Sequence, residues 1–306
     1  MLSRRSFLAA GSALAAAASS GCQSAPGRST AAVRVRVWDE RQPAQKQAYP
    51  NWLGNRIADH LRTVPGLAVE SVSLDDPQQG LAELESVDVL VWWGHVRHME
   101  IEPPTALRIV ERVRAGKLRL VALHSAHWSR PFVEAMNAVA RERALAALSE
   151  EERSRAVFVE SELLPRPFMA PSYSERLSPS VQYRRPPTGP VEIRLVRANA
   201  CFPAYRPDGK PSRIEVRLPA HPLARGLPTS FAVPRTEMYD EPFHVPAPDE
   251  VVLEEHWEGG EWFRSGSVWR LGAGRIVYFR PGHETYPVYL DPLALRVVEN
   301  AVVWKP

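Results

Sequence analysis

Between residues 33 and 123, short apolar runs alternate with longer segments in which apolar residues recur every three or four positions. We expect strands at residues 33–38, 67–74, 87–93 and 118–123, with helices at residues 51–61 and 103–116 between them. The second helix begins with two prolines and ends at a glycine, as helices commonly do. Strands that alternate with helices predict a parallel sheet joined by right-handed crossovers.

The run at 87–98 reads V-D-V-L-V-W-W-G-H-V-R-H and lies at the centre of this pattern. Its first half has no polar residue after Asp88, which is typical of a strand that other layers cover on both faces. Its second half changes abruptly to Gly94, His95 and His98. Because ligands bind at the carboxyl edge of open α/β sheets, we expect the functional site at this edge.

The pattern is less regular after residue 124. A charged helix is expected at 141–155 and extended Pro-rich loops at 161–190, so that residues 141–212 form an insertion in the fold. Later strands are expected at 191–196, 214–218, 251–257, 262–271 and 275–279, and a last helix at 293–304. The segment E-G-G-E at 258–261 is expected to form the turn of a β-hairpin.

Residues 1–22 have the composition of an export signal, with a basic start, an alanine-rich middle and small residues before Cys22. The pair Arg4-Arg5 resembles a twin-arginine signal, and Gly21-Cys22 resembles a lipoprotein cleavage site. Residues 23–31 are expected to form a tether to a domain at 32–306. We therefore expect an exported protein, periplasmic or attached to the membrane by a lipid on Cys22, with an uncleaved signal anchor as the alternative.

The composition supports a globular domain and argues against one class of partner. With 306 residues, of which 44% are hydrophobic, the chain can bury a sizeable core. Its 38 basic and 35 acidic residues leave a formal net charge of +3, which argues against a nucleic-acid-binding surface. The chain has two cysteines, so an exported form with Cys22 acylated has no internal disulfide.

Histidines follow three of the expected strands. An H-x-x-H pair follows each of the strands at 87–93 and 118–123, and a His-Glu pair follows the strand at 275–279. Imidazoles and a carboxylate that meet at one sheet edge suit a divalent metal such as zinc, manganese or iron. The candidate ligands are His95, His98, His124, His127 and His283. Alternatively, some of these histidines cap strand ends through hydrogen bonds to the backbone.

Acid–base chemistry without a metal is a second possibility at this edge. A histidine titrates near neutral pH and can act as a general base, and carboxylates lie close to the same strand ends. The candidate catalytic residues are His124, His283, Glu284 and Glu237. Asp39, at the end of the first strand, is equally suited to cap the helix that follows.

Five segments resemble the ThuA family of trehalose-utilisation proteins: V-W-D-E at 37–40, V-W-W-G-H-V-R-H at 91–98, L-H-S-A-H at 123–127, E-M-Y-D-E-P-F at 237–243 and G-R-I-V-Y-F-R-P-G-H-E-T-Y-P at 274–287. The resemblance implies an α/β fold with a mostly parallel, doubly wound sheet flanked by helices. This fold is similar to class I glutamine amidotransferases and to flavodoxin, here with a Pro-rich insertion and a C-terminal β-hairpin.

Three features depart from these relatives. The family often has a Gly-Ile-His turn where this chain has Trp52-Leu53-Gly54, and the insertion before Cys201 is long. The turn at 123–127 lacks the catalytic cysteine of the amidotransferases, so glutamine hydrolysis by that route is not expected.

The resemblance implies an enzyme of carbohydrate catabolism that acts on trehalose, another disaccharide or a 3-keto glycoside, beside a sugar oxidoreductase of the same pathway. Aromatic faces pack on sugar rings and carboxylates bind their hydroxyls. The candidate substrate-binding residues are Trp38, Glu40, Trp93, Tyr239 and Tyr286. Core packing is the alternative for the aromatic residues, and Trp92 is expected to be buried.

Two other functions stay open. The first is a non-catalytic, exported sugar-binding lipoprotein that hands its ligand to a transporter or dehydrogenase. The second is an amidase or peptidase in which Ser125 is the nucleophile and His127 its base.

Overall fold

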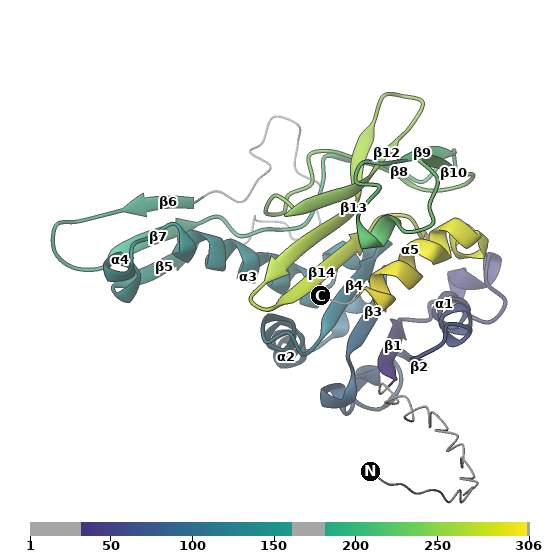
Figure 1. Cartoon of the computed structure of the whole chain (residues 1–306), viewed down its shortest axis with the longest axis horizontal. Helices are drawn as coiled ribbons and strands as arrows, with labels where there is room; N and C mark the ends of the chain where they lie inside the picture. Colours follow the sequence, from purple (N-terminus) through teal and green to yellow (C-terminus); the bar gives the residue numbers. More distant parts are fainter. Residues whose placement is uncertain (1–31, 161–180, 305–306) are drawn as a thin grey trace, which may run out of the picture. The chain divides into compact units, whose positions relative to one another are not determined.

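A nine-stranded mixed sheet forms the centre of the fold (Figure 1). The computed structural model describes residues 32–160 and 181–304. In spatial order the strands are β10 (Ser230–Val233), β9 (Ser212–Val216), β12 (Glu250–His256), β13 (Trp262–Leu271), β14 (Gly274–Phe279), β4 (Arg119–Leu123), β3 (Val89–Trp93), β1 (Val33–Asp39) and β2 (Leu67–Ser73). The strands from β14 to β2 are parallel, and those from β13 to β10 continue the sheet in antiparallel pairs.

Helices cover both faces of the parallel part of the sheet (Figure 1). On one face lie α1 (Leu53–Arg62) and α5 (Pro292–Val303), and on the other lie α2 (Pro103–Arg114) and α3 (Arg130–Ala146). Short 3-10 helices occupy several connections: η1 (Pro43–Gln47), η2 (Pro77–Gly80), η3 (Leu84–Ser86), η4 (His98–Glu100), η5 (His124–Trp128), η6 (Pro222–Ala224) and η7 (Val288–Leu290).

Alternate residues of the central strand β3 enter the two core layers. Val89, Val91 and Trp93 pack on the side of α1 and α5, whereas Leu90 and Trp92 pack on the side of α2 and α3. All five residues are buried. The predicted strand covered on both faces and the predicted α/β fold with a mostly parallel central sheet are therefore confirmed.

Two smaller sheets accompany the main one. β5 (Ala156–Glu160), β7 (Val191–Leu195) and β6 (Val181–Arg184) form a three-stranded sheet within the expected insertion. β8 (Ala204–Arg206) pairs with β11 (Met238–Asp240), which places Tyr205 opposite Tyr239. This short ribbon brings aromatic side chains to the candidate site.

Most residues of the predicted helix at 141–155 are helical, but they belong to two helices. α3 ends at Ala146, and a separate short helix, α4 (Glu150–Ser154), follows it. Ser149 and Glu152 form a capping box, in which each side chain accepts a hydrogen bond from the other's backbone N–H, and this motif starts a new helix. The true start of α3 is capped by Ser129, whose hydroxyl accepts from the backbone N–H of Phe132.

The prediction of extended loops at 161–190 is wrong for residues 181–184. They form β6, because Val181 and Tyr183 pack against a small core that contains Ile193. The predictions for residues 1–31 and 161–180 lie outside the described residues. The predicted strands at 191–196, 214–218, 251–257, 262–271 and 275–279 match β7, β9, β12, β13 and β14 within about two residues. Among the described residues, no helix has the length and apolar character needed to span a membrane.

Gly274 allows β14 to pass close to α2. A methyl group at this position would lie 1.9 Å from the carbonyl oxygen of Val113, so the backbone would have to move. We expect Gly274→Ala to lower the free energy of unfolding by about 3 kcal/mol in a denaturant titration. The control is Gly226→Ala, whose methyl group meets nothing within 4 Å and whose positive φ alone costs about 1 kcal/mol. Equal losses in both variants would contradict this account of the contact between β14 and α2.

Candidate functional site

Three neighbouring strands end at the same place in the candidate site. β3, β4 and β14 are parallel neighbours, and their last residues are in register. His95, His124 and His283 lie just beyond these three strand ends. Their ring centroids are 5.3 to 5.9 Å apart. The sheet therefore brings three imidazoles from distant parts of the sequence together.

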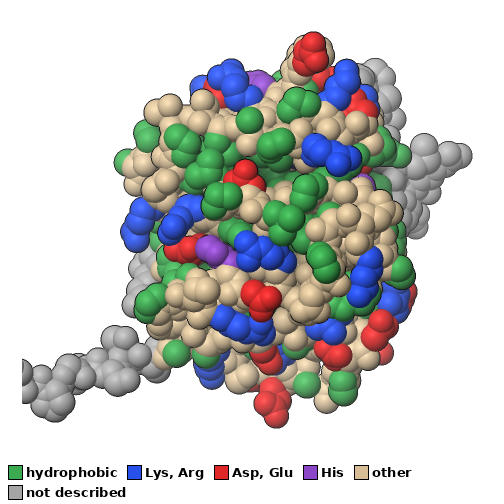
Figure 2. Space-filling model, turned by 90° about the vertical axis from the view of Figure 1, so that its right-hand side faces the viewer, with side chains coloured by type: hydrophobic (Ala, Val, Ile, Leu, Met, Phe, Trp, Pro, Cys, Tyr) green, Lys and Arg blue, Asp and Glu red, His purple; other side chains and the backbone are tan. Residues whose placement is uncertain are grey.

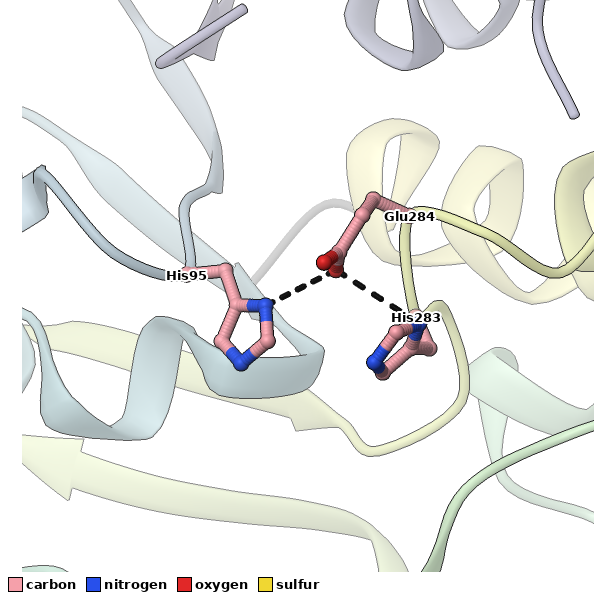
Figure 3. Close-up of side chains that lie close together, drawn as sticks. All are labelled: His95, His283 and Glu284. Atoms are coloured by element: carbon pink, nitrogen blue, oxygen red, sulfur yellow. Dashed lines mark hydrogen bonds and ion pairs between the residues drawn. The ribbon is translucent and has the colours of Figure 1, made fainter. Parts of the chain in front are cut away.

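Glu284 lies between His95 and His283 (Figure 3). Its Oε2 is 2.8 Å from Nδ1 of His95 and 3.6 Å from Nδ1 of His283. One ligand atom from each of the three residues lies within 4.8 Å of the other two, close enough to share a metal ion. The backbone N–H of Thr285 donates to Nδ1 of His283 at 3.3 Å, and Thr285 Oγ1 lies 3.0 Å from the same nitrogen, so Thr285 fixes the orientation of this ring.

The charges of this group suit a cation. Burial of Glu284 raises its pKa, but the hydrogen bond from His95 and the charges of His95 and His283 outweigh burial and lower the pKa to about 2. Burial lowers the pKa of His95, but the hydrogen bond and charge of Glu284 outweigh it, so the pKa of His95 is raised. Burial lowers the pKa of His283 to about 4. At neutral pH the carboxylate is therefore ionised and His283 is neutral, as metal ligands must be, and a bound metal would displace the proton that Glu284 stabilises on His95.

His124 begins η5 with a strained backbone. Its φ is 53°, in the left-handed region that costs a non-glycine residue about 1 kcal/mol or more. Nδ1 of its ring lies 3.0 Å from the backbone oxygen of Arg280. Because a carbonyl can only accept, Nδ1 carries the proton. Burial lowers the pKa of His124 well below its usual value, so the ring is neutral and Nε2 is an acceptor.

Nε2 of His124 faces a second acceptor. Oε2 of Glu237 lies 3.3 Å away, and both groups are buried. An ionised Glu237 would place two unprotonated acceptors against each other, which is unfavourable without water. Burial raises the pKa of Glu237, which favours its protonated form. The contact in this Glu237–His124 pair is favourable when a proton lies between the two atoms. The hydroxyl of Tyr239, 3.4 Å from the same Nε2, is a second group that can donate to it.

Arg280 holds both members of this pair. Its backbone oxygen accepts from His124, and its guanidinium donates to the backbone oxygen of Glu237 and to Thr236 Oγ1. The guanidinium also forms a two-pronged ion pair with Glu255, and both side chains are fully buried. Ser265 donates a further hydrogen bond to the Glu255 carboxylate.

A cavity of about 130 Å³ opens beside these groups. Its lining consists of His95, Ser125, His127, Trp128, Phe202, Tyr205, Glu237 and Tyr239. Glu237 faces the cavity, whereas His124 is fully buried behind it. The volume is about four times that of a water molecule in the liquid, so the cavity can hold one end of a sugar-sized molecule. Tyr205, 59% exposed, supplies an open aromatic face.

Two of the candidate ligands lie outside the group of three imidazoles. His98 is buried against Gly94, and burial lowers the pKa of His98 to about 3. His127 uses Nδ1 to hydrogen-bond the backbone oxygen of Ala200, and its ring packs against Tyr239 and Phe243. His127 therefore has the alternative role considered for these histidines, a hydrogen bond to the backbone, and His98 is packed in the core.

Three of the candidate substrate-binding residues are buried and do not line the cavity; they support the residues around it. Trp38 is buried and stacks on Trp92 with ring centroids 4.0 Å apart. Trp93 is also buried and donates from Nε1 to the backbone oxygen of Gly282, next to His283. The carboxylate of Glu40 accepts from the backbone N–H groups of Val96 and Arg97 and so fixes the loop that carries His95.

The two tyrosines lie closer to the histidines. The ring of Tyr286 is 4.9 Å from that of His283, and its hydroxyl donates to the backbone oxygen of Pro207. Tyr239 stacks on His124 and lines the cavity. Asp39 accepts from the backbone N–H of Gly54 and caps the start of α1, one of the two roles open to it.

Ser125 and His127 do not form a nucleophile–base pair in the structure. Ser125 Oγ bonds to the hydroxyl of Tyr239 at 3.1 Å, and His127 Nδ1 bonds to Ala200. A serine nucleophile needs its base within hydrogen-bond reach. This geometry does not favour the amidase hypothesis.

A family model described as "ThuA: Trehalose utilisation" matches residues 34–305. The chain belongs to the ThuA family. A ThuA-like protein from Bacteroides uniformis is 14% identical with a TM-score of 0.50, covering 91% of this chain and 94% of its own. A ThuA-like protein from Parabacteroides merdae has the same identity and TM-score, with 88% of each chain covered. At this identity the two structures support the fold, and the comparison with curated proteins found no match.

In this ThuA protein, the turn after β4 begins at His124 and contains no cysteine. At the turn that departs from the family's Gly-Ile-His pattern, Gly54 lies against Asp39, and an added methyl group would come within 2.5 Å of Asp39 Cβ.

Sequence reasoning missed Arg280, Glu255 and Tyr205. Arg280 had a usable signal, because it directly follows the buried strand β14 inside a family motif. Glu255 lies in an alternating strand, where a charged residue normally faces solvent, so its burial was not foreseeable. Tyr205 follows the Pro-rich region and gains its position from the pairing of β8 with β11.

We expect Glu237→Gln to stabilise the protein as the pH rises. Burial raises the pKa of folded Glu237 above its usual 4.5, so ionisation of this group destabilises the fold increasingly above that pH. Glutamine does not ionise, and its amide can donate to His124 Nε2. The variant should gain about 1 kcal/mol over the parent at pH 8 and less at pH 5, measured by denaturation with EDTA present. If the stability difference between the variant and the parent did not change with pH, the raised pKa of Glu237 would be contradicted.

Proposed function

We propose that this ThuA family member is an enzyme that moves a proton at the carbon next to a sugar carbonyl, with a divalent metal held by His95, His283 and Glu284. One observation carries this proposal: a single cavity is lined both by His95, one of the three candidate metal ligands, and by Glu237 of the Glu237–His124 pair. A site that only bound sugar would not need the clustered histidines.

The donor set fits zinc, manganese or iron. Two imidazoles and one carboxylate leave coordination positions open, as catalytic metal sites do. When bound, the metal would polarise the carbonyl oxygen of the substrate and stabilise negative charge on it. The protein's part is to hold the three ligands in place through Thr285 and the loop fixed by Glu40.

Glu237 is the group that reaches the substrate. It faces the cavity and, once ionised, can take a proton from carbon, while Nε2 of His124 accepts a hydrogen bond from the carboxyl group that forms. The tautomer fixed by Arg280 keeps Nε2 ready for this role. We therefore assign base function to Glu237 and place His124 behind it as its proton partner.

Membership of the ThuA family supports a disaccharide or its 3-keto form as substrate, supplied by a sugar oxidoreductase. Tyr205, which is 59% exposed, provides an aromatic face for a sugar ring beside the cavity. On the face shown in Figure 2, basic and acidic side chains are interspersed, which is typical of a protein whose ligand is not a nucleic acid. The export signal expected at residues 1–22 would place the reaction outside the cytoplasm.

Metal binding tests the first half of this proposal. After EDTA treatment, calorimetric titration with Zn²⁺ or Mn²⁺ should give one site per chain. His95→Ala and His283→Ala should each weaken binding by about 100-fold, because each removes a ligand. The control is His60→Ala, which removes a half-buried histidine of α1 that pairs with Glu299. Equal binding in all four proteins would place the metal elsewhere.

Solvent-deuterium uptake tests the second half. The metal-loaded protein in D₂O should exchange the hydrogens next to the carbonyl of 3-keto-trehalose, followed by mass spectrometry. Glu237→Gln should reduce the rate by about 10²- to 10⁴-fold, the usual contribution of a general base. The control is Glu261→Gln, whose carboxylate pairs with Arg206. Binding of the sugar without exchange by the parent would favour the alternative, a sugar-binding protein.

A further inference from the structure

A second cavity lies at the opposite edge of the parallel sheet from the histidines. Its volume is about 290 Å³, and it is lined by the first residues of β1, β3, β4 and β14 together with the end of α5. The histidines follow the carboxyl ends of β3, β4 and β14. The five residues of β4 span about 17 Å, so the two places are separate.

Positive charge gathers in this cavity without matching negative charge. Lys117, Arg119 and Arg275 line it. Arg119 and Arg275 are neighbours, because each immediately precedes the paired residues Leu120 and Ile276 of β4 and β14. Across the described ranges 32–160 and 181–304, no carboxylate forms an ion pair with any of the three. The one acidic residue of the lining, Asp88, is paired with Arg34 at 2.7 Å.

Three shielded arginines of the protein, Arg36, Arg264 and Arg280, each pair with a glutamate. Arg275 forms no ion pair with a described carboxylate, and its Nη1 is buried without a hydrogen-bond partner. Burial and the positive charge of Arg275 together lower the pKa of Arg119 to about 10. A buried N–H donor without an acceptor, next to a second positive charge, destabilises the folded protein. A bound anion would supply the missing acceptor.

The end of α5 accounts for part of this charge. Nη1 of Arg119 donates to the backbone oxygens of Ala301 and Val302, as a basic residue at a helix C-terminus often does. Arg275 has no such contact. Instead its guanidinium carbon lies 4.6 Å from the centre of the Trp304 ring, which covers one face of the guanidinium group.

We propose that this cavity binds a small organic oxyanion, a carboxylate or a phosphate ester, whose charged group pairs with Arg275 and Arg119. Guanidinium groups bind such oxyanions through paired N–H donors. Val33, Leu118, Val302 and Trp304 supply apolar surface for the body of the ligand. The site is independent of the proposed chemistry at the histidines.

The test is calorimetric titration of the full chain with benzoate, with benzamide as its uncharged analogue, and with inorganic phosphate, all at constant ionic strength. The parent should bind benzoate or phosphate at one site and should not bind benzamide. Arg275→Gln should weaken that binding at least tenfold. The control is Arg62→Gln, which removes an exposed positive charge at the end of α1 and should leave binding unchanged. Tighter benzoate binding identifies an organic carboxylate, and tighter phosphate binding identifies a phosphate group.

Thermal unfolding separates a ligand site from a purely structural role. In buffer with chloride only, Arg275→Gln should melt at the same temperature as the parent or higher, because it removes the like charge beside Arg119. The anion that binds should raise the melting temperature of the parent but not that of the variant. The proposal is overturned if neither anion binds the parent, if the variant and the Arg62→Gln control bind equally, or if the variant is destabilised without anion.

Discussion

The buried ion pair between Arg280 and Glu255 connects the parts of this structure. Glu255 belongs to β12 in the antiparallel part of the sheet, and Arg280 follows β14 in the parallel part. Loss of one partner of such a pair typically destabilises a protein by about 3 to 5 kcal/mol, since the other charge is left buried. The same arginine positions His124 through its backbone oxygen and Glu237 through its guanidinium. The fold and the candidate chemistry therefore depend on one contact beneath the site.

The site combines features that folding alone does not favour. His124 has a left-handed backbone, and its Nε2 faces the acceptor Oε2 of Glu237. Strain and unbalanced polar groups tend to occur where function requires them, because the rest of the fold compensates for their cost. Here the compensation comes from the buried strands β3, β4 and β14 and from the Arg280–Glu255 pair. This reasoning supports a chemical role for the cluster.

Much of the fold could be predicted, because the apolar strands and the Pro-in, Gly-out helix boundaries are local signals. The meeting of His95, His124 and His283 followed from a parallel sheet, since the carboxyl ends of its strands share one edge. The directions of the side chains could not be predicted. His127 and His98 turn away into packed surroundings, and this depends on contacts with Ala200 and Gly94 that no local pattern shows. The buried role of Glu255 likewise depends on distant partners.

The central claim is that the ends of β3 and β14 build one metal centre beside the Glu237–His124 pair. A crystal structure of the full chain grown with Zn²⁺, with anomalous scattering recorded at the zinc edge, tests this claim most directly. The account predicts an anomalous peak about 2.0 to 2.2 Å from an imidazole nitrogen of His95, an imidazole nitrogen of His283 and a carboxylate oxygen of Glu284. Zinc bound elsewhere in the chain, with these three side chains in contact with water alone, would contradict it.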